Sequence, residues 1–341
     1  MPSFCSRVSI SLKMSNNSLI STALELDGHQ VSPQNFRLPT LGPILLSLAR
    51  KLHEGCGFFL LRGLDPCEFS TADNVLIFLG IASHIGNLRG RQNKNRHMLT
   101  HVTDVISPVP RSKRHGINST VEIESHTEVI SDILALQTIR KAATGGTTTI
   151  SPLWSIYNDL AKRRPDVIRL LSEPLWPLQN PYTPPNICRP LLFHTNGKVI
   201  LSFDPGSLRR LETETVPGVP PLCDSQLEAI EVLLSTAAQY RYPVTAQPGD
   251  MLFINNFSHM HSRSAYVDEG CQRRHLIRLW LHNQELGWQL PGHLRPSWEK
   301  VFANDDNMPE KYPVEPVPIY KAPRITMGSG STHLIEDDSD D

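Results

Sequence analysis

The sequence lacks any uninterrupted apolar run near the ~20 residues that a membrane-spanning helix requires. It also lacks an excess of charge, because its 341 residues carry a net charge of −1. No global field therefore attracts nucleic acid or an anionic membrane. The six cysteines do not have the spacing of a metal site, and in a chain of this length they indicate reduced thiols. We expect a cytoplasmic protein with neither a nucleic-acid nor a membrane partner; composition leaves the oligomeric state unknown.

The two ends of the chain differ in composition from the middle. Residues 1–20 contain Arg7 and Lys13, several serines and no acid, without the apolar core of a secretion signal. Residues 306–341 are rich in proline and then acidic, ending in Glu336-Asp-Asp-Ser-Asp-Asp341, a composition typical of disorder. We predict a flexible leader over residues 1–26, a single domain over 27–305 and a disordered tail over 306–341.

Short strands and a few helices are predicted for the middle of the chain. Amphipathic spacing and capping residues indicate helices, at 41–52, 71–85, 151–163 or 155–163, 166–171 and 224–239. Apolar or β-branched runs indicate strands, at 58–61, 99–106, 132–143, 251–256 and 274–282, with a hairpin over 191–203 around Asn196-Gly197. Regular strand–helix alternation is missing. The predicted fold class is therefore mainly β with α, a double-stranded β-helix (jelly roll) core decorated by helices.

The stretch His126-Thr127-Glu128 is a candidate for metal binding. In an extended strand, side chains at i and i+2 point to the same side, so His126 and Glu128 could bind one metal together. Two histidines and one carboxylate on one face of a ferrous ion leave positions open for a co-substrate and dioxygen. By itself, however, one H-x-E pair on a strand is more often a solvated pair than a metal site.

A third ligand would have to come from a distant strand. The downstream candidates are His194, His259, His261, His275 and His282. His261 follows the turn and strand of residues 247–256, which favours a fixed position at a strand end. His259 is its main rival, because in an extended backbone both side chains point to the same side.

Two arginines on one predicted strand indicate an anion site. Alternation places Arg274 and Arg278 on the same face as Leu276 and Trp280, although it does not say which face is inward. On the outer face, both would be ordinary surface residues. An inward arginine needs an anionic partner, since an unpaired buried charge is costly. A dicarboxylate could provide that partner and chelate a metal with its other end.

These motifs, in this order, resemble the iron(II)/2-oxoglutarate dioxygenases of the taurine dioxygenase and clavaminate synthase-like superfamily, in particular its fungal small-molecule branch. The resemblance runs from about Gly57 to Pro291. The stretches that carry it are Gly57-Phe58, Leu61-Arg-Gly63, Ser83-His-Ile-Gly86, Arg89-Gly-Arg-Gln92, His101-Val-Thr-Asp104, His126-Thr-Glu128, Asp132-Ile-Leu-Ala-Leu136, Gly145-Gly146, Tyr157-Asn158, Arg164-Pro-Asp166, Pro248-Gly-Asp250, Asn255-Asn256, His261-Ser-Arg263 and Arg274-His-Leu-Ile-Arg-Leu-Trp280.

The resemblance implies a role for each of six residues. His126, Glu128 and His261 match the ligands of Fe(2+), which favours His261 over His259. Arg274 matches the clamp for the distal carboxylate of 2-oxoglutarate, and Thr148 matches a helper hydroxyl there. Arg278 matches a position that meets either the co-substrate or an acidic group of the substrate. Most members have Asp at the position of Glu128, but clavaminate synthases also use Glu, and a carboxylate there argues against a halogenase.

The implied activity is oxidation of a small metabolite, by hydroxylation, desaturation or cyclisation, with release of succinate and CO2. Such chemistry is typical of secondary metabolism, and Arg278 favours a carboxylate-bearing substrate. We expect the proline-rich loop 174–190 and the basic loop 84–97 to contact it. One alternative is a catalytically impaired family member that acts as a metal or small-molecule binding protein. Another is a non-redox metal enzyme on a jelly roll, which would not need the Arg274 and Thr148 clamp.

Overall fold

The computed structural model describes residues 7–9, 27–93, 95–105, 116–177, 188–208, 220–302 and 309–316. The rest of the predicted leader, most of the predicted tail and residues 178–187 of the proline-rich loop lie outside the described residues. Within these ranges, no helix is both long and apolar enough to cross a membrane.

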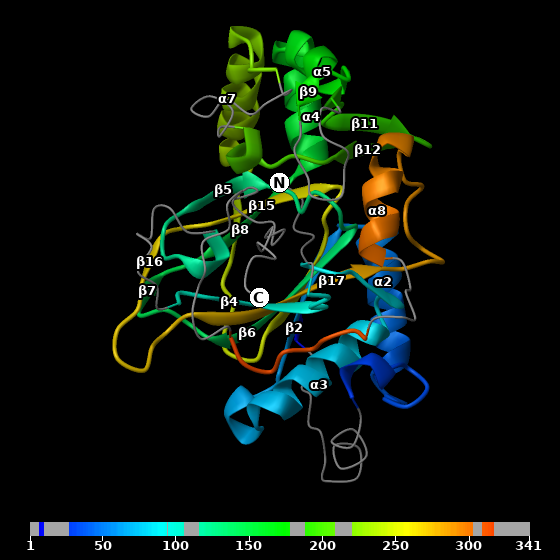
Figure 1. Cartoon of the computed structure of the whole chain (residues 1–341), viewed down its shortest axis with the longest axis vertical. Helices are drawn as coiled ribbons and strands as arrows, with labels where there is room; N and C mark the ends of the chain where they lie inside the picture. The colour runs from blue at the N-terminus through cyan, green and yellow to red at the C-terminus, as the bar shows by residue number, and fades with distance from the viewer. Residues whose placement is uncertain are drawn as a thin grey trace, which may run out of the picture.

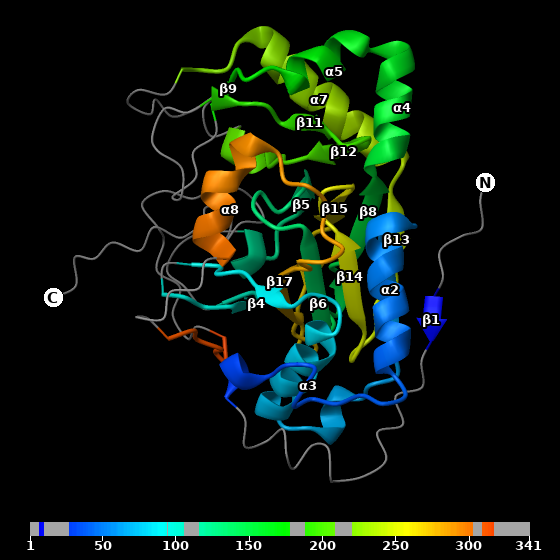
Figure 2. The ribbon, with the colours of Figure 1, turned by 90° about the vertical axis from the view of Figure 1, so that its right-hand side faces the viewer.

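Two β-sheets face each other in the centre of the protein (Figures 1 and 2). The larger has seven strands, in the order β1 (Arg7–Ser9), β2 (Phe58–Arg62), β14 (Met251–Asn255), β6 (Ile133–Arg140), β17 (His275–His282) and β3 (Leu88–Arg89), with β4 (Leu99–Thr103) also paired to β17. The smaller has four, in the order β13 (Tyr242–Val244), β8 (Thr148–Pro152), β15 (His259–Arg263) and β5 (Ile123–His126). Two-stranded pairs join β16 (Tyr266–Val267) to β7 (Thr144–Gly145) and β10 (Cys188–Arg189) to β9 (Trp176–Pro177).

The space between the two sheets is filled by apolar side chains from both. The larger sheet contributes Leu134, Leu136, Leu252, Leu276 and Trp280, and the smaller sheet contributes Ile150 and Val244. Alternation along β17 gives its other face, with Ile277 and Leu279, to a second core. The face of β17 that carries Leu276 and Trp280 is therefore the inward one. The predicted jelly roll is confirmed.

Helices α2 (Gly42–Glu54) and α3 (Thr71–Ser83) lie on the outer face of the larger sheet (Figure 1). Their apolar sides bury Leu45, Phe78 and Leu79 against that sheet. The Ser70 hydroxyl accepts a hydrogen bond from the amide of Asp73 at 3.1 Å, which caps the start of α3. Both helices confirm the sequence prediction.

A helical layer lies beyond the smaller sheet, at the top of Figure 1. It consists of α4 (Leu153–Arg163), α5 (Pro165–Ser172) and α7 (Asp224–Gln239), packed on the hairpin of β11 (Leu192–Thr195) and β12 (Lys198–Leu201). Asn196 and Gly197 both have positive φ, 49° and 71°, as the predicted two-residue hairpin turn requires. The remaining elements are α8 (Arg295–Phe302) and the 3-10 turns η1 (Gly28–Gln30), η2 (Pro66–Glu68), η4 (Gly116–Asn118) and η5 (Gly292–Leu294).

Parts of the predicted leader and tail have defined places. Within the leader, β1 pairs in parallel with β2. Within the tail, Lys311 forms a bridge with His97, and the Tyr312 hydroxyl lies 3.1 Å from Arg89 Nη1. Arg89 belongs to the basic loop 84–97, and its guanidinium also donates to the carbonyls of Gly28 and Val31. This arginine therefore ties chain segments together.

Candidate metal centre

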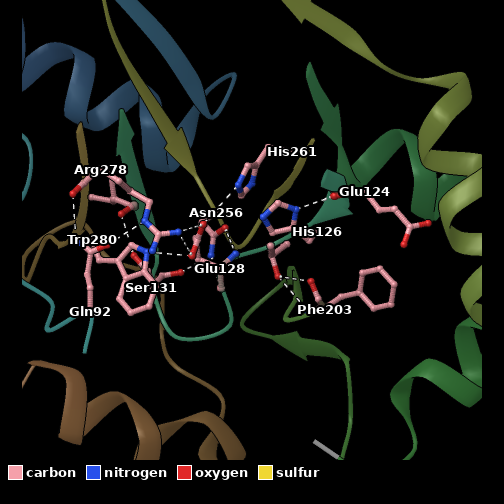
Figure 3. A network of polar contacts seen from close by, with 12 residues as sticks. Gln92, Glu124, His126, Glu128, Ser131, Phe203, Asn256, His261, Arg278 and Trp280 are labelled. Atoms are coloured by element: carbon pink, nitrogen blue, oxygen red, sulfur yellow. Dashed lines mark hydrogen bonds and ion pairs between the residues drawn. The ribbon is translucent and has the colours of Figure 1, made fainter. Parts of the chain in front are cut away.

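Three ionisable side chains meet between the two sheets. His126 ends β5 and is the direct cross-strand partner of His261 on β15, with ring centroids 4.2 Å apart. Glu128 follows two residues after His126. One ligand atom from each of the three lies within 4.8 Å of the other two, and all three side chains are buried. Within the described ranges, this is the one group of three or more such side chains that could hold a metal (Figure 3).

The histidine rings are oriented for ligation by Nε2. His126 Nδ1 lies 2.7 Å from the Glu124 carbonyl and donates to it, which leaves the Nε2 lone pair for a metal. His261 Nε2 lies 3.6 Å from Glu128 Oε1. Burial, together with the neighbouring His261, lowers the pKa of His126 to about 4. His126 is therefore neutral at neutral pH, as a metal ligand must be.

Glu128 does not owe its position to a strand. The predicted strand through His126 and Glu128 is wrong at its end, because β5 stops at His126. Instead, the Thr127 amide donates to the Phe203 carbonyl at 2.8 Å, and the Phe203 amide donates to Thr127 Oγ1 at 2.8 Å. The Asn256 side chain accepts from the Glu128 amide at 2.7 Å and donates to the carbonyls of Glu128 and Ser131, each at 2.6 Å. These tertiary hydrogen bonds fix the loop in place of a sheet ladder.

The Glu128 carboxylate is ionised and paired. Arg278 Nη1 donates to both of its oxygens, at 3.0 and 3.1 Å, and Trp280 Nε1 donates to Oε2 at 3.1 Å (Figure 3). Burial favours the neutral acid, but the Arg278 charge and the interaction with His261 outweigh it and bring the pKa of Glu128 to about 2. Arg278 was expected at the co-substrate or substrate, and in this structure it contacts a candidate metal ligand.

Arg274 lies at a small cavity, and one nitrogen of its guanidinium has no hydrogen-bond partner among the described residues. Its Nε donates to the Gly146 carbonyl at 3.2 Å, whereas its buried Nη1 has no hydrogen-bond partner in the described part of the chain. The cavity has a volume of about 100 Å³ and is lined by both arms of the predicted clamp, Arg274 and Thr148, together with Leu136, Thr138 and Leu276 among others. Burial, aided by the charge of Arg263, lowers the pKa of Arg274 to about 9. An anion in this cavity would satisfy the charge.

Glycine 146 leaves room for that arginine. Its φ is +68°, and a Cβ at this position would lie 2.8 Å from Arg274 Cδ. A side chain here would therefore meet both backbone strain and a clash. Gly146 is thus part of the arginine's surroundings.

The other four candidate histidines lie apart from the cluster. His259 is fully buried between the rings of Phe58 and Trp154. His194 contacts Tyr157, His275 contacts His101, and His282 contacts Asp132. The structure therefore brings His261, and none of its rivals, to His126 and Glu128.

Sequence reasoning missed three supports of the site, namely Asn256, Gln92 and Trp280. All three stood within stretches that carried the family resemblance, but no role was attached to them. Their types gave no chemical indication, because a buried amide or indole is usually a structural hydrogen-bonding group.

The donor set fits iron(II). Two imidazoles and one carboxylate on one side of a site are the ligands of non-haem iron oxygenases. The orphaned Arg274 Nη1, at a cavity that Thr148 also lines, fits the distal carboxylate of 2-oxoglutarate.

Comparison with known proteins agrees with this fit. Residues 23–280 match the profile of the taurine catabolism dioxygenase TauD, TfdA family. The chain belongs to this TauD/TfdA family. It is 34% identical over 290 residues to the taurine hydroxylase-like protein SAT17 of Stachybotrys chartarum, which covers 81% of this chain and 74% of that protein. It is 24% identical over 271 residues to FR-33289 synthase of Streptomyces rubellomurinus, covering 75% and 78%.

Solved structures share the fold of this TauD/TfdA chain. Asparagine oxygenase superposes with a TM-score of 0.61 at 16% identity, covering 84% of this chain and 99% of that one. The non-heme iron oxygenase OrfP with iron superposes with a TM-score of 0.54 at 20% identity, covering 84% and 100%. The chain is an iron(II)- and 2-oxoglutarate-dependent dioxygenase that acts on a small metabolite.

Proposed function

We propose that His126, Glu128 and His261 bind the iron, and that Arg274 and Thr148 bind the distal carboxylate of 2-oxoglutarate. One observation carries the proposal: three ligand atoms lie within 4.8 Å of one another inside a jelly roll that also buries Arg274, whose Nη1 has no hydrogen-bond partner in the described part of the chain. When bound, iron(II) and 2-oxoglutarate supply the oxidant by activating dioxygen.

The two halves of the site lie on one continuous inner surface. His261 pairs with Ile150 across β15 and β8, and Thr148 stands two residues before Ile150, on the same face. Arg274, just before β17, reaches the cavity, and Arg278, four residues later on β17, reaches Glu128. A short dicarboxylate with one end at Arg274 would extend its other end towards the histidines.

The side chains of the site each contribute a definite property. The neutral His126 ring offers a lone pair without losing a proton, and the ionised Glu128 offers negative charge. The leucine and isoleucine side chains between the sheets exclude bulk water, which protects a reactive oxidant from wasteful reactions. Arg274 orients the co-substrate by charge and geometry.

We also infer that the substrate is a small molecule bearing a carboxylate. Arg278 was expected to bind that carboxylate, but its guanidinium is paired with Glu128, so this inference is supported by relatives of the same fold. Relatives of the same fold have been crystallised with L-Arg and with 3-hydroxyasparagine, and amino acids carry such a group. The product, whether hydroxylated, desaturated or cyclised, depends on which C–H bond the site presents. A cytoplasmic location and a single domain over residues 27–305 stay predictions from composition.

An anaerobic titration tests the ligand assignment. Adding iron(II) and 2-oxoglutarate to the full chain should produce the weak visible metal-to-ligand charge-transfer band of their chelate. His126→Ala and His261→Ala should abolish the band. His259→Gln is the matched control, since His259 lies on the same strand as His261 but outside the cluster, and it should keep the band. A wild-type chain without a band at saturating iron and 2-oxoglutarate would refute the proposal.

A second assay separates an active enzyme from the alternative of an impaired binding protein. Succinate release would be measured with a panel of amino acids and with the amines that lack their carboxylates. Stimulation by the acids alone supports the proposed substrate class. A chain that forms the charge-transfer complex but releases succinate with no member of the panel would favour the binding protein.

A further inference from the structure

The Glu128 carboxylate accepts hydrogen bonds from two side chains of one strand, Arg278 and Trp280. Trp280 and Arg278 stand two residues apart on the inner face of β17 (Figure 3). Oxygen Oε2 receives Trp280 Nε1 and Arg278 Nη1, both at 3.1 Å. Oxygen Oε1 receives Arg278 Nη1 at 3.0 Å and is the one that faces His261 Nε2, at 3.6 Å. The two oxygens therefore have different surroundings.

Gln92 fixes the guanidinium in turn. This side chain is fully buried, and its Nε2 donates to the carbonyls of Met98 at 2.9 Å and Arg278 at 3.0 Å. Both amide hydrogens are thus used, so Oε1 is the acceptor for Arg278 Nε, at 2.9 Å. The amide cannot be turned over without losing these bonds. Gln92 comes from the basic loop 84–97, which was expected to contact substrate.

We infer that Gln92 and Trp280 are positioning residues that make Glu128 a one-oxygen metal ligand. The inference rests on the proposed function, in which Glu128 binds the iron. Glu has one more rotatable bond than Asp, and a free carboxylate on such an arm can chelate a metal through both oxygens. Chelation would occupy a coordination position that the co-substrate and dioxygen need. The indole N–H on Oε2 keeps that oxygen engaged, and Gln92 keeps Arg278 in the orientation that reinforces it.

Cobalt(II) titration of the metal-free full chain tests the inference without relying on turnover. The variants are Trp280→Phe, which removes the indole donor, and Gln92→Met, which removes the amide at similar size. We expect the Kd for Co(II) to rise roughly 10- to 100-fold in each, as for other residues that orient metal ligands. We also expect weaker Co(II) d–d absorption per bound ion, because two-oxygen binding by Glu128 raises the coordination number.

Matched controls remove the same groups elsewhere. Trp176 is a fully buried indole that donates to the Leu170 carbonyl at 2.9 Å, and Gln226 is a buried amide that donates to the Leu175 carbonyl at 3.0 Å. Both lie in the helical layer, so Trp176→Phe and Gln226→Met should keep the wild-type Kd and spectrum.

The outcomes distinguish the inference from the function on which it rests. A folded Trp280→Phe chain with the wild-type Kd and d–d spectrum would overturn the inference while leaving the metal site intact. If near-ultraviolet circular dichroism shows that Trp280→Phe does not fold, Gln92→Met decides by the same two measurements. Failure of the wild-type chain itself to bind Co(II) would overturn the proposed function.

Discussion

Replacing Arg274 by methionine should stabilise the metal-free protein and remove its response to 2-oxoglutarate. The Arg274 side chain is buried, and its Nη1 has no hydrogen-bond partner in the described residues. Arginine does not lose its proton in proteins, so burying this charge lowers the free energy of unfolding of the metal-free chain. Replacing buried ionic groups by apolar side chains of similar size commonly stabilises by about 1–4 kcal/mol. We expect a gain within that range in the free energy of unfolding.

The same change should weaken 2-oxoglutarate binding. Removing one partner of a buried, hydrogen-bonded charge pair costs about 2–5 kcal/mol, which corresponds to about 30-fold or more in Kd. Denaturant unfolding gives the stability of the metal-free chain, and thermal shift with Co(II) and increasing 2-oxoglutarate gives the binding. Wild type should gain stability as 2-oxoglutarate is added, and Arg274→Met should not.

Arg263→Met provides the contrasting control. Arg263 is also a buried arginine near the same cavity, but its guanidinium donates to the carbonyls of Gly116, Ser119 and Val121. Loss of the guanidinium leaves these three carbonyl groups without their donor, so this variant should be less stable than wild type. If Arg274→Met destabilised the metal-free chain as much as Arg263→Met, or if it still responded to 2-oxoglutarate like wild type, the reasoning from the unpaired charge would be refuted.

Three further predictions concern single sites. Gly146→Ala should abolish stabilisation by 2-oxoglutarate, because its Cβ would press on Arg274, whereas Gly197→Ala, with a similar positive φ and nothing within 4 Å, should only lower the melting temperature. Asn256→Ala should cost about 2–4 kcal/mol in denaturant unfolding by releasing the Glu128 and Ser131 backbone groups, and should weaken Co(II) binding; unchanged binding would contradict its role. The metal-free chain should lose stability as pH falls from 6.5 to about 4. Burial lowers the pKa of His259 to about 4 in the folded chain, so the unfolded chain binds more protons in that window. His259→Gln should flatten the dependence of the unfolding free energy on pH, and an unchanged dependence would contradict the role of His259.

Most of the fold could be predicted because its helices and turns have local sequence patterns. The α2 and α3 helices have amphipathic spacing or a capping serine, and the β11–β12 hairpin has Asn196-Gly197 at its turn. Such local patterns do not depend on distant contacts. The inward face of β17 was different, since alternation gives two faces without naming the buried one. Only the packing of Leu276 and Trp280 against the smaller sheet decides it.

The position of Glu128 could not be predicted by the strand rule that first singled it out. Strand β5 ends at His126. Thr127 and Glu128 are held by hydrogen bonds with Phe203 and Asn256, which lie far away in sequence. The i, i+2 spacing therefore singled out two side chains that the structure does bring together, but through a strand geometry that the structure does not have. What placed the carboxylate was a set of tertiary hydrogen bonds, and a single sequence does not encode these in any local pattern.

Arg274, just before β17, and Arg278 on β17 have the same residue type and a predicted common face, but different surroundings in the structure. Arg274 and Arg278 stand four residues apart, both are buried, and alternation gives them one face. A register shift between His275 and Leu276 and the turn at Gly146 bring Arg274 to the cavity, whereas Gln92 directs Arg278 to Glu128. Arg278 finds its counter-charge in Glu128. The charge of Asp268 acts on Arg274, but no carboxylate in the described part of the chain accepts a hydrogen bond from its guanidinium, and a ligand carboxylate would supply that partner.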